Sequence, residues 1–256
     1  MTKTFDSDGV RIAYVDENAS GPRGTILLIH GFASNIIMNW TSPSWVRELT
    51  HAGYRVVAFD NRGHGDSDKL YELADYGAPL MAEDARRLLD HLGIAKAHVM
   101  GYSMGARIAA FLILRHPERV LSAVFGGLGI NMVRGMAGTG PIAHALEAPS
   151  IDDVKNPTAR TFRAFADQTG SDLRALAACI RSARDPISAE NVGRITCPVL
   201  VAVGDADVIG GPAADLAALI PNARAFVIEG RDHMKAVGDR SYKRAVLEFL
   251  EAVPTH

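Results

Sequence analysis

Short runs of apolar residues recur along the chain and alternate with longer segments of helical periodicity. Eight of the short runs have the length and the β-branched composition of strands. The first two flank Asp8-Gly9, a turn dipeptide, and are therefore expected to pair as a β-hairpin. The other six are apolar at nearly every position, as expected of parallel strands buried on both faces. The predicted strands are residues 2–6, 10–14, 26–29, 55–59, 97–101, 120–125, 199–203 and 225–228.

Helical periodicity fills most of the intervening segments. Residues 81, 85, 88, 89 and 92 are apolar and lie on one helical face, and Gly93 follows where a left-handed cap is expected. The same pattern runs from Tyr242 to Val253. Strands that alternate with helices in this way predict a mostly parallel sheet covered on both sides.

Residues 127–192 break the alternation, and we call them the insertion. Six glycines lie between positions 126 and 140, too many for a regular element. Two helices are predicted after them, one capped by Asn156 with Pro157 at its first position, and one capped by Ser171. We interpret the insertion as a small helical unit between two parts of the core, residues 1–126 and 193–256. The alternative is that its helices belong to the cover of the main sheet.

Composition narrows the class of protein. The 256 residues carry 27 Lys+Arg against 29 Asp+Glu, and 48% are hydrophobic, which is typical of a soluble globular protein. The near-neutral charge argues against nucleic acid or an anionic membrane surface as a partner. No apolar run approaches the about 18 residues of a membrane span, and the first residues lack the apolar region of a signal peptide, so we expect a cytoplasmic protein. Cys179 and Cys197 form neither a metal-ligand spacing nor a disulfide framework.

Candidate chemistry begins at Gly101-Tyr102-Ser103-Met104-Gly105, a G-x-S-x-G motif. It lies between a predicted strand and a segment of helical pattern over residues 104–116. Strand, tight turn and helix are the setting of a nucleophile elbow, in which a strained turn requires small residues on both sides of the serine. The helix N-terminus there would favour a developing negative charge. The context predicts that Ser103 is a nucleophile, and the alternative is a purely structural turn.

Two further motifs make the sequence resemble the α/β-hydrolase superfamily over essentially its whole length. His30-Gly31-Phe32 follows a predicted strand, as the oxyanion motif of the family does, and residues 60–67 resemble the family's D-x-R-G-x-G-x-S loop. The resemblance implies a three-layer α/β/α sandwich around a mostly parallel eight-stranded sheet. It also implies that the insertion is a small helical lid placed after the sixth strand.

The resemblance also implies a catalytic triad. A serine needs a general base that is oriented by a carboxylate, and in this fold the order along the chain is serine, acid, histidine. Gly230-Arg231-Asp232-His233 matches the family's histidine loop, so His233 is the expected base. Gly204-Asp205-Ala206-Asp207 resembles the family's G-x-x-D, which makes Asp207 the acid. Composition alone does not choose between the two aspartates; Asp205 is expected to accept hydrogen bonds from backbone N–H groups of the turn.

The oxyanion hole is expected at the backbone N–H groups of Met104 and Phe32, the second of these from the resemblance. His30 is expected to hold its loop by hydrogen bonding, and Arg62 with the neighbouring glycines to fix residues 60–67. Asp232 precedes the predicted base; it is either solvated or raises the pKa of His233.

These residues predict a serine hydrolase that cleaves carboxylic esters with apolar, short-to-medium acyl groups through an acyl-enzyme. The partner is a small-molecule ester, no metal or organic cofactor is implied, and the oligomeric state is not predicted. Lactone, polyester, thioester or carbon–carbon bond hydrolysis and cofactor-free perhydrolysis of the haloperoxidase type stay open. The serine counts against haloalkane dehalogenases and epoxide hydrolases, whose elbow carries aspartate. A small-molecule receptor is the alternative from another class. Apolar residues of the insertion are expected to face Ser103: Phe162, Phe165, Leu173, Leu176 and Ile180.

Overall fold

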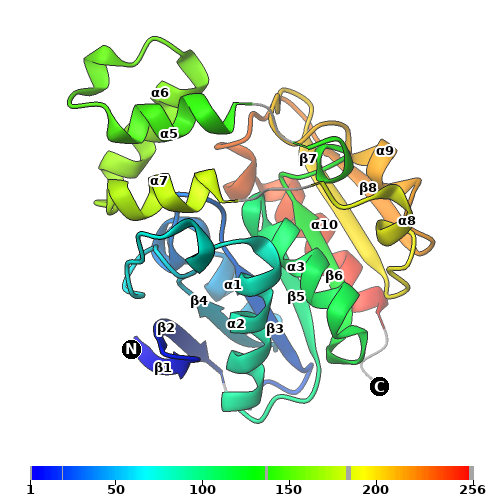
Figure 1. Cartoon of the computed structure of the whole chain (residues 1–256). Helices are drawn as coiled ribbons and strands as arrows, with labels where there is room; N and C mark the ends of the chain where they lie inside the picture. The colour runs from blue at the N-terminus through cyan, green and yellow to red at the C-terminus, as the bar shows by residue number, and fades with distance from the viewer. Residues whose placement is uncertain (1, 19, 136–137, 183–185, 254–256) are drawn as a thin grey trace.

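A mixed sheet runs through the centre of the molecule (Figure 1). The computed structural model describes residues 2–18, 20–135, 138–182 and 186–253, and within them eight strands pair in the order β1-β2-β4-β3-β5-β6-β7-β8. β1 and β2 form an antiparallel hairpin, β2 pairs antiparallel with β4, and all other pairs are parallel. The strands are β1 (Lys3–Ser7), β2 (Val10–Glu17), β3 (Thr25–Ile29), β4 (Arg55–Phe59), β5 (Ala97–Tyr102), β6 (Val120–Gly126), β7 (Val199–Gly204) and β8 (Ala223–Ile228).

The predicted fold class and hairpin are confirmed. Each end of every predicted strand lies within three residues of the corresponding end of an observed strand. One expectation about burial is wrong. β8 is not covered on both faces: Arg224 and Ala225 are exposed, and Val227 is 50% exposed. The reason is its position at the edge of the sheet, where it pairs with β7 alone.

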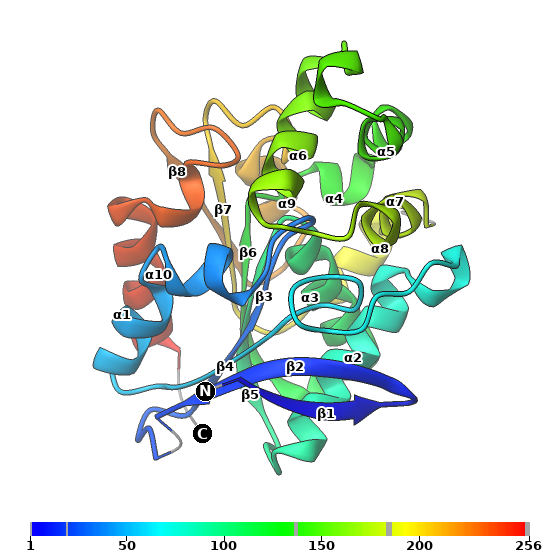
Figure 2. The same ribbon diagram turned by 90° about the vertical axis from the view of Figure 1, so that its left-hand side faces the viewer.

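Helices cover both faces of the sheet, as Figure 2 shows in edge view. α2, α3, α8 (Ala189–Val192) and α9 share one hydrophobic cluster on one face, whereas α1 and α10 share a second cluster on the other. No helix in the described part of the chain combines the length and apolar composition needed to cross a bilayer. The helices of the core are α1 (Trp45–His51), α2 (Ala78–His91), α3 (Met104–Arg115), α9 (Ala213–Ala217) and α10 (Arg240–Ala252).

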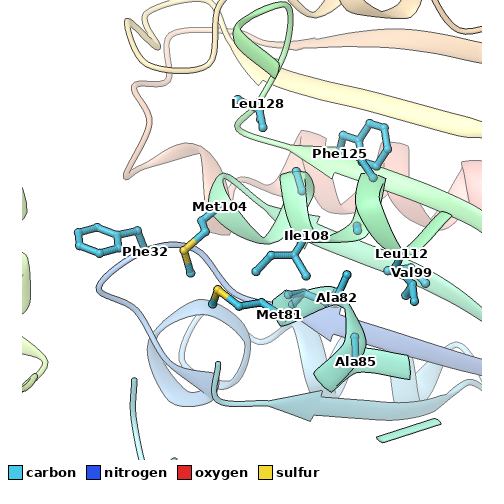
Figure 3. Packing of buried hydrophobic residues seen from close by; sticks show 14 of the residues in the cluster. Phe32, Met81, Ala82, Ala85, Val99, Met104, Ile108, Leu112, Phe125 and Leu128 are labelled. Carbon is cyan, nitrogen blue, oxygen red and sulfur yellow. The ribbon is translucent and has the colours of Figure 1, made fainter. Parts of the chain in front are cut away.

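The packing of α2 against α3 fixes the position of the G-x-S-x-G motif. Ile108 and Leu112 on α3 lie against Ala82 and Ala85 on α2, and all four side chains are fully buried (Figure 3). Alanine at the contact positions of α2 lets the two helices approach closely. α3 therefore begins at a fixed place beyond the end of β5.

The insertion lies beyond the carboxyl ends of the strands, where α5 packs on both α6 and α7 (Figure 1). Its residues 136–137 and 183–185 are outside the described residues. The last helix, α8, was not predicted; it packs against α3 and belongs to the cover of the sheet. The helices of the insertion are α4 (Asn131–Arg134), α5 (Thr139–Glu147), α6 (Pro157–Gln168), α7 (Leu173–Arg181) and α8 (Ala189–Val192).

Two local expectations about the insertion are wrong. The glycine-rich segment does not lack regular structure, because α4 and the start of α5 lie in it. The cap of α7 is Asp172 rather than Ser171: the Asp172 carboxylate accepts hydrogen bonds from the N–H groups of Arg174 and Ala175. The predicted cap of α6 is confirmed, since Asn156 Oδ1 accepts from the N–H of Ala159 at 2.9 Å.

Candidate active site

Ser103 occupies a strained turn between β5 and α3. Its backbone has φ 55° and ψ −113°, in the region that side chains other than glycine rarely adopt. A Cβ on Gly101 would lie 2.2 Å from the Gly105 carbonyl oxygen, and a Cβ on Gly105 would lie 1.9 Å from the Ile29 carbonyl oxygen. Both glycines are therefore needed for the strand and helix to meet at this angle, which confirms the predicted need for small residues.

The turn brings Ser103 to His233 and Asp207 on two later loops. Ser103 Oγ lies 3.0 Å from His233 Nε2, and His233 Nδ1–H donates to Asp207 Oδ2 at 2.7 Å. The other oxygen of Asp207, Oδ1, accepts from the N–H groups of Ile209 (2.8 Å) and Gly210 (3.0 Å). A carboxylate accepts only, so it fixes the proton on Nδ1 and leaves Nε2 free to accept from the serine. The arrangement can move a proton from Ser103 to His233.

Asp205 and Asp232 hold the loops that carry this arrangement. Asp205 Oδ1 accepts from the N–H of Gly230 at 2.8 Å, so it is a backbone acceptor as predicted, although its donor lies in the next loop rather than in its own turn. Asp232 Oδ1 accepts from the N–H groups of Met234 and Lys235. The backbone hydrogen bond from Lys235 lowers the pKa of Asp232, and its side chain is 46% exposed. Asp232 thus turns toward its own loop and toward solvent.

Phe32 and Met104, the predicted oxyanion-hole residues, line a small cavity together with Ser103. The loop that carries Phe32 lies close to the serine: a Cβ on Gly31 would be 3.4 Å from Ser103 Cβ and 3.1 Å from the Tyr102 carbonyl oxygen. Asn39 Oδ1 accepts from the N–H of Gly31 at 3.0 Å and fixes this approach. Asn39 was not predicted, because an asparagine within an apolar run gives no signal for such a contact. That the two N–H groups bind an oxyanion stays a prediction.

His30 fastens the same loop to the loop of residues 60–67, as predicted. Its Nδ1–H donates to the Gly31 carbonyl oxygen at 2.7 Å, and its Nε2 accepts from the N–H of Asn61 at 2.9 Å. Burial lowers the pKa of His30, which keeps the ring neutral and able to accept at one nitrogen. Arg62 forms a buried two-pronged ion pair with Asp84, with both contacts at 2.8 Å. These groups hold the loops in place.

Tyr102 is a functional neighbour that the sequence did not reveal. Its hydroxyl donates to the His233 carbonyl oxygen at 2.6 Å, and the two rings lie 5.6 Å apart. Tyr102 fills a variable position of the G-x-S-x-G motif, so the motif gives no information about it. This contact ties the end of β5 directly to the histidine loop.

A second serine–histidine pair lies elsewhere in the molecule. His98 Nδ1 is 2.8 Å from Ser122 Oγ, across the paired strands β5 and β6. His98 is 1% exposed and Ser122 is fully buried, and burial lowers the pKa of His98 to about 4. No substrate reaches a pair inside the sheet, so we interpret it as structural.

Three cavities surround Ser103 and His233. The first, about 160 Å³, is lined by both residues together with Phe162 and Phe165 of α6. The second, about 30 Å³, is lined by Ser103 but not by His233. The third, about 350 Å³, is lined by His233 but not by Ser103. Of the other insertion residues expected to face the site, Ile180 lines the second cavity, whereas Leu173 and Leu176 pack in the core cluster.

Comparison with known proteins concerns the fold of the chain. The family model of the alpha/beta hydrolase fold matches residues 24–137. The chain also superposes on the crystal structure of a hydrolase from Pseudomonas aeruginosa PA01 with a TM-score of 0.74 and 27% identity, covering 98% of each chain. The chain has the α/β-hydrolase fold, and both comparisons identify it as similar to α/β hydrolases.

Two curated relatives of this α/β hydrolase match about half of its length. It is 39% identical over 119 residues to the dihydrolipoyllysine-residue acetyltransferase component of the acetoin cleaving system of Cupriavidus necator, covering 46% of this chain and 29% of the relative. It is 36% identical over 113 residues to bifunctional epoxide hydrolase 2 of Rattus norvegicus, covering 44% of this chain and 19% of the relative. The matched region thus spans less than a third of either relative.

Metal-ligating side chains do not gather in this α/β hydrolase. Among the residues that the structure describes, no three or more His, Cys, Asp or Glu side chains lie close enough together to hold a metal ion.

Proposed function

We propose that this protein is a serine hydrolase that cleaves carboxylic esters with apolar groups through an acyl-enzyme intermediate. The observation that carries the proposal is the continuous hydrogen-bonded chain from Ser103 through His233 to Asp207, which begins at a strained strand–helix turn. Such a chain raises the nucleophilicity of a serine hydroxyl, which is weak on its own.

Each residue has a role in the proposed reaction. Ser103 Oγ attacks the ester carbonyl while His233 Nε2 accepts its proton, and Asp207 stabilises the imidazolium that forms. The backbone N–H groups of Phe32 and Met104 stabilise the tetrahedral oxyanion. His233 then donates its proton to the leaving alcohol. Water deacylates the serine by the same steps in reverse.

The insertion is proposed to act as a lid with an apolar face. Phe162 and Phe165 of α6 line the cavity of about 160 Å³ that Ser103 and His233 share, and Met38, Met234 and Val237 add further apolar surface. A cavity of this composition favours apolar substrate groups of short to medium length. The hydrogen bonds that connect the insertion to the core include one from Tyr71 Oη to Asp172 Oδ2 at 2.8 Å and one from Thr169 Oγ1 to the Ala33 carbonyl oxygen at 3.2 Å.

Related reactions use the same set of groups. Lactone, thioester, polyester and carbon–carbon bond hydrolysis and cofactor-free perhydrolysis all fit a serine–histidine–aspartate triad. Ser103 at the elbow favours acyl transfer over epoxide opening, for which the family uses an aspartate there. The same fold without turnover would be a small-molecule receptor, and steady turnover of an activated ester separates that function from an enzyme.

The test is covalent labelling with a fluorophosphonate probe, together with turnover of 4-nitrophenyl acetate. Ser103→Ala is expected to abolish labelling and to lower kcat by about 10⁴ or more, because no other group replaces the nucleophile. The matched control is Ser122→Ala, which removes the other serine that lies against a histidine. It is expected to label and turn over like the parent protein. Labelling that persists in Ser103→Ala and disappears in Ser122→Ala would overturn the proposal.

A further inference from the structure

Phe162 holds a position that no other residue around the site shares. Of the described residues, it alone lines all three cavities beside Ser103 and His233. It projects from α6, is 4% exposed, and its ring centroid lies 6.0 Å from that of Phe32. The two rings together form the wall between the cavity of about 160 Å³ and the cavity of about 30 Å³, since both rings line both cavities.

The position of His233 tells which substrate group each cavity can take. The leaving alcohol must receive its proton from His233 Nε2, so it requires a cavity lined by both His233 and Ser103. Only the 160 Å³ cavity among the three meets this requirement. The 30 Å³ cavity contacts Ser103 and Met104, on the oxyanion side, and lacks His233. It is therefore placed for the acyl group.

The sizes of the two cavities differ by more than a methylene group. A cavity of about 30 Å³ holds roughly two water molecules, which leaves room for the alkyl part of an acetyl or propionyl group. An apolar cavity of roughly 150 Å³ accepts a benzene ring. The larger cavity, at about 160 Å³ and lined by Phe162 and Phe165, therefore suits an aryl alcohol.

We propose that Phe162 determines substrate specificity by separating a short-acyl site from an aryl-alcohol site, so that the preferred substrates are acetyl and propionyl esters of aryl alcohols. The proposal rests on the serine-hydrolase function proposed above and narrows its short-to-medium acyl range. The third cavity touches His233 but not Ser103 and lies beside Asp232 and Lys235, so neither substrate group is assigned to it.

The experiment measures kcat/KM for 4-nitrophenyl acetate, butyrate and hexanoate, because kcat/KM reports the acylation step at a constant leaving group. The parent protein is expected to prefer acetate over butyrate by at least about tenfold, the effect of one or two methylenes that a filled apolar pocket does not accept. In Phe162→Ala the wall is removed, and the acetate-to-hexanoate ratio is expected to fall by at least about tenfold. Phe162→Leu keeps an apolar side chain in this position and serves as the second variant should Phe162→Ala not fold. Its acetate-to-hexanoate ratio is expected to lie between those of the parent protein and Phe162→Ala.

Phe165→Ala is the matched control, since it also removes a phenyl ring from α6. The ring of Phe165 lines only the larger of the two cavities beside Ser103. The acyl-length profile of Phe165→Ala is expected to stay within about twofold of the parent, whereas its preference for phenyl acetate over ethyl acetate falls. A flat acyl-length profile in the parent protein, or an unchanged profile in both Phe162 variants, would overturn the specificity proposal while ester turnover continues. If the parent protein showed neither ester turnover nor fluorophosphonate labelling, the proposed hydrolase function would be wrong, and the specificity proposal with it.

Discussion

Asp207→Asn is the most informative single substitution, because it changes one proton rather than the shape of the site. The two backbone N–H donors from Ile209 and Gly210 hold Oδ1, so the asparagine carbonyl oxygen is expected to stay at that position. The new NH₂ group then takes the place of Oδ2 and faces His233 Nδ1, which lay 2.7 Å from that oxygen. Because an NH₂ group donates, the imidazole must accept at Nδ1 and carry its proton on Nε2.

The magnitude follows from this change of tautomer. With a proton on Nε2, His233 can no longer accept the proton of Ser103, which it approaches at 3.0 Å. Exchange of a triad aspartate for asparagine of this kind lowers kcat by about 10⁴, which corresponds to about 5 kcal/mol in the activation free energy. The fold is expected to persist, because the two hydrogen bonds to Oδ1 and the volume of the side chain are unchanged.

The assay compares kcat for 4-nitrophenyl acetate with the melting temperature of each variant. Asp205→Asn is the matched control: it also alters an aspartate of the loop after β7, whose Oδ1 accepts from the Gly230 N–H, and is expected to lose at most about tenfold in kcat and roughly 1 kcal/mol in stability. If Asp205→Asn lost about 10⁴ in kcat and Asp207→Asn remained active, the assignment of the acid would be wrong.

Two further predictions concern stability. Gly105→Ala places a Cβ 1.9 Å from the Ile29 carbonyl oxygen and is expected to lower the free energy of unfolding in urea by about 3 kcal/mol or more. Gly140→Ala, whose Cβ has no atom within 4 Å, is the control and is expected to stay within about 1 kcal/mol of the parent. Equal stability of the two variants would contradict the close packing at the elbow. Burial lowers the pKa of His98 to about 4, whereas in the unfolded chain this histidine titrates near 6.5. The contribution of His98 to the free energy of unfolding, about 3 kcal/mol, is therefore fully present above pH 6.5 and is lost as the pH falls toward 4. In His98→Gln the free energy of unfolding is expected to change less with pH between 6.5 and 4 than in the parent protein. An unchanged slope would show that His98 does not cause this pH dependence.

Most of the fold was predictable because buried parallel strands leave an unbroken apolar signal. β4 (Arg55–Phe59) was predicted at its observed bounds for this reason. β8 gave a weaker signal, because an edge strand keeps polar positions such as Arg224, and its start was placed two residues late. α5 was missed because Gly140 and Pro141 open it, and composition alone favours a loop there. The cap of α7 was placed one residue early, because Ser171 and Asp172 are both good capping residues and only the backbone conformation decides between them.

The site divides in the same way between local and distant information. Motifs that follow strands were sufficient to select Ser103, Asp207 and His233, which the structure brings within hydrogen-bond distance; their catalytic roles remain predictions. Tyr102 and Asn39 could not be selected, because their partners are set by folding rather than by a motif. The hydroxyl of Tyr102 reaches a carbonyl 131 positions along the chain, and nothing in the neighbouring sequence encodes that contact.

The exposed edge strand β8 has a consequence for how the protein would lose activity. His233 lies in the loop directly after β8, which is hydrogen-bonded to β7 along one side only and has half of Val227 in solvent. Edge elements with few buried contacts open at lower cost than a central strand such as β5, which carries Ser103 at its end. The loop that carries the base is therefore expected to open at a lower free-energy cost than the turn that carries the nucleophile. At low denaturant concentration the protein is therefore expected to lose activity while most of its native structure persists. In that state Ser103 keeps its position at the end of β5, whereas His233 no longer lies within reach of it.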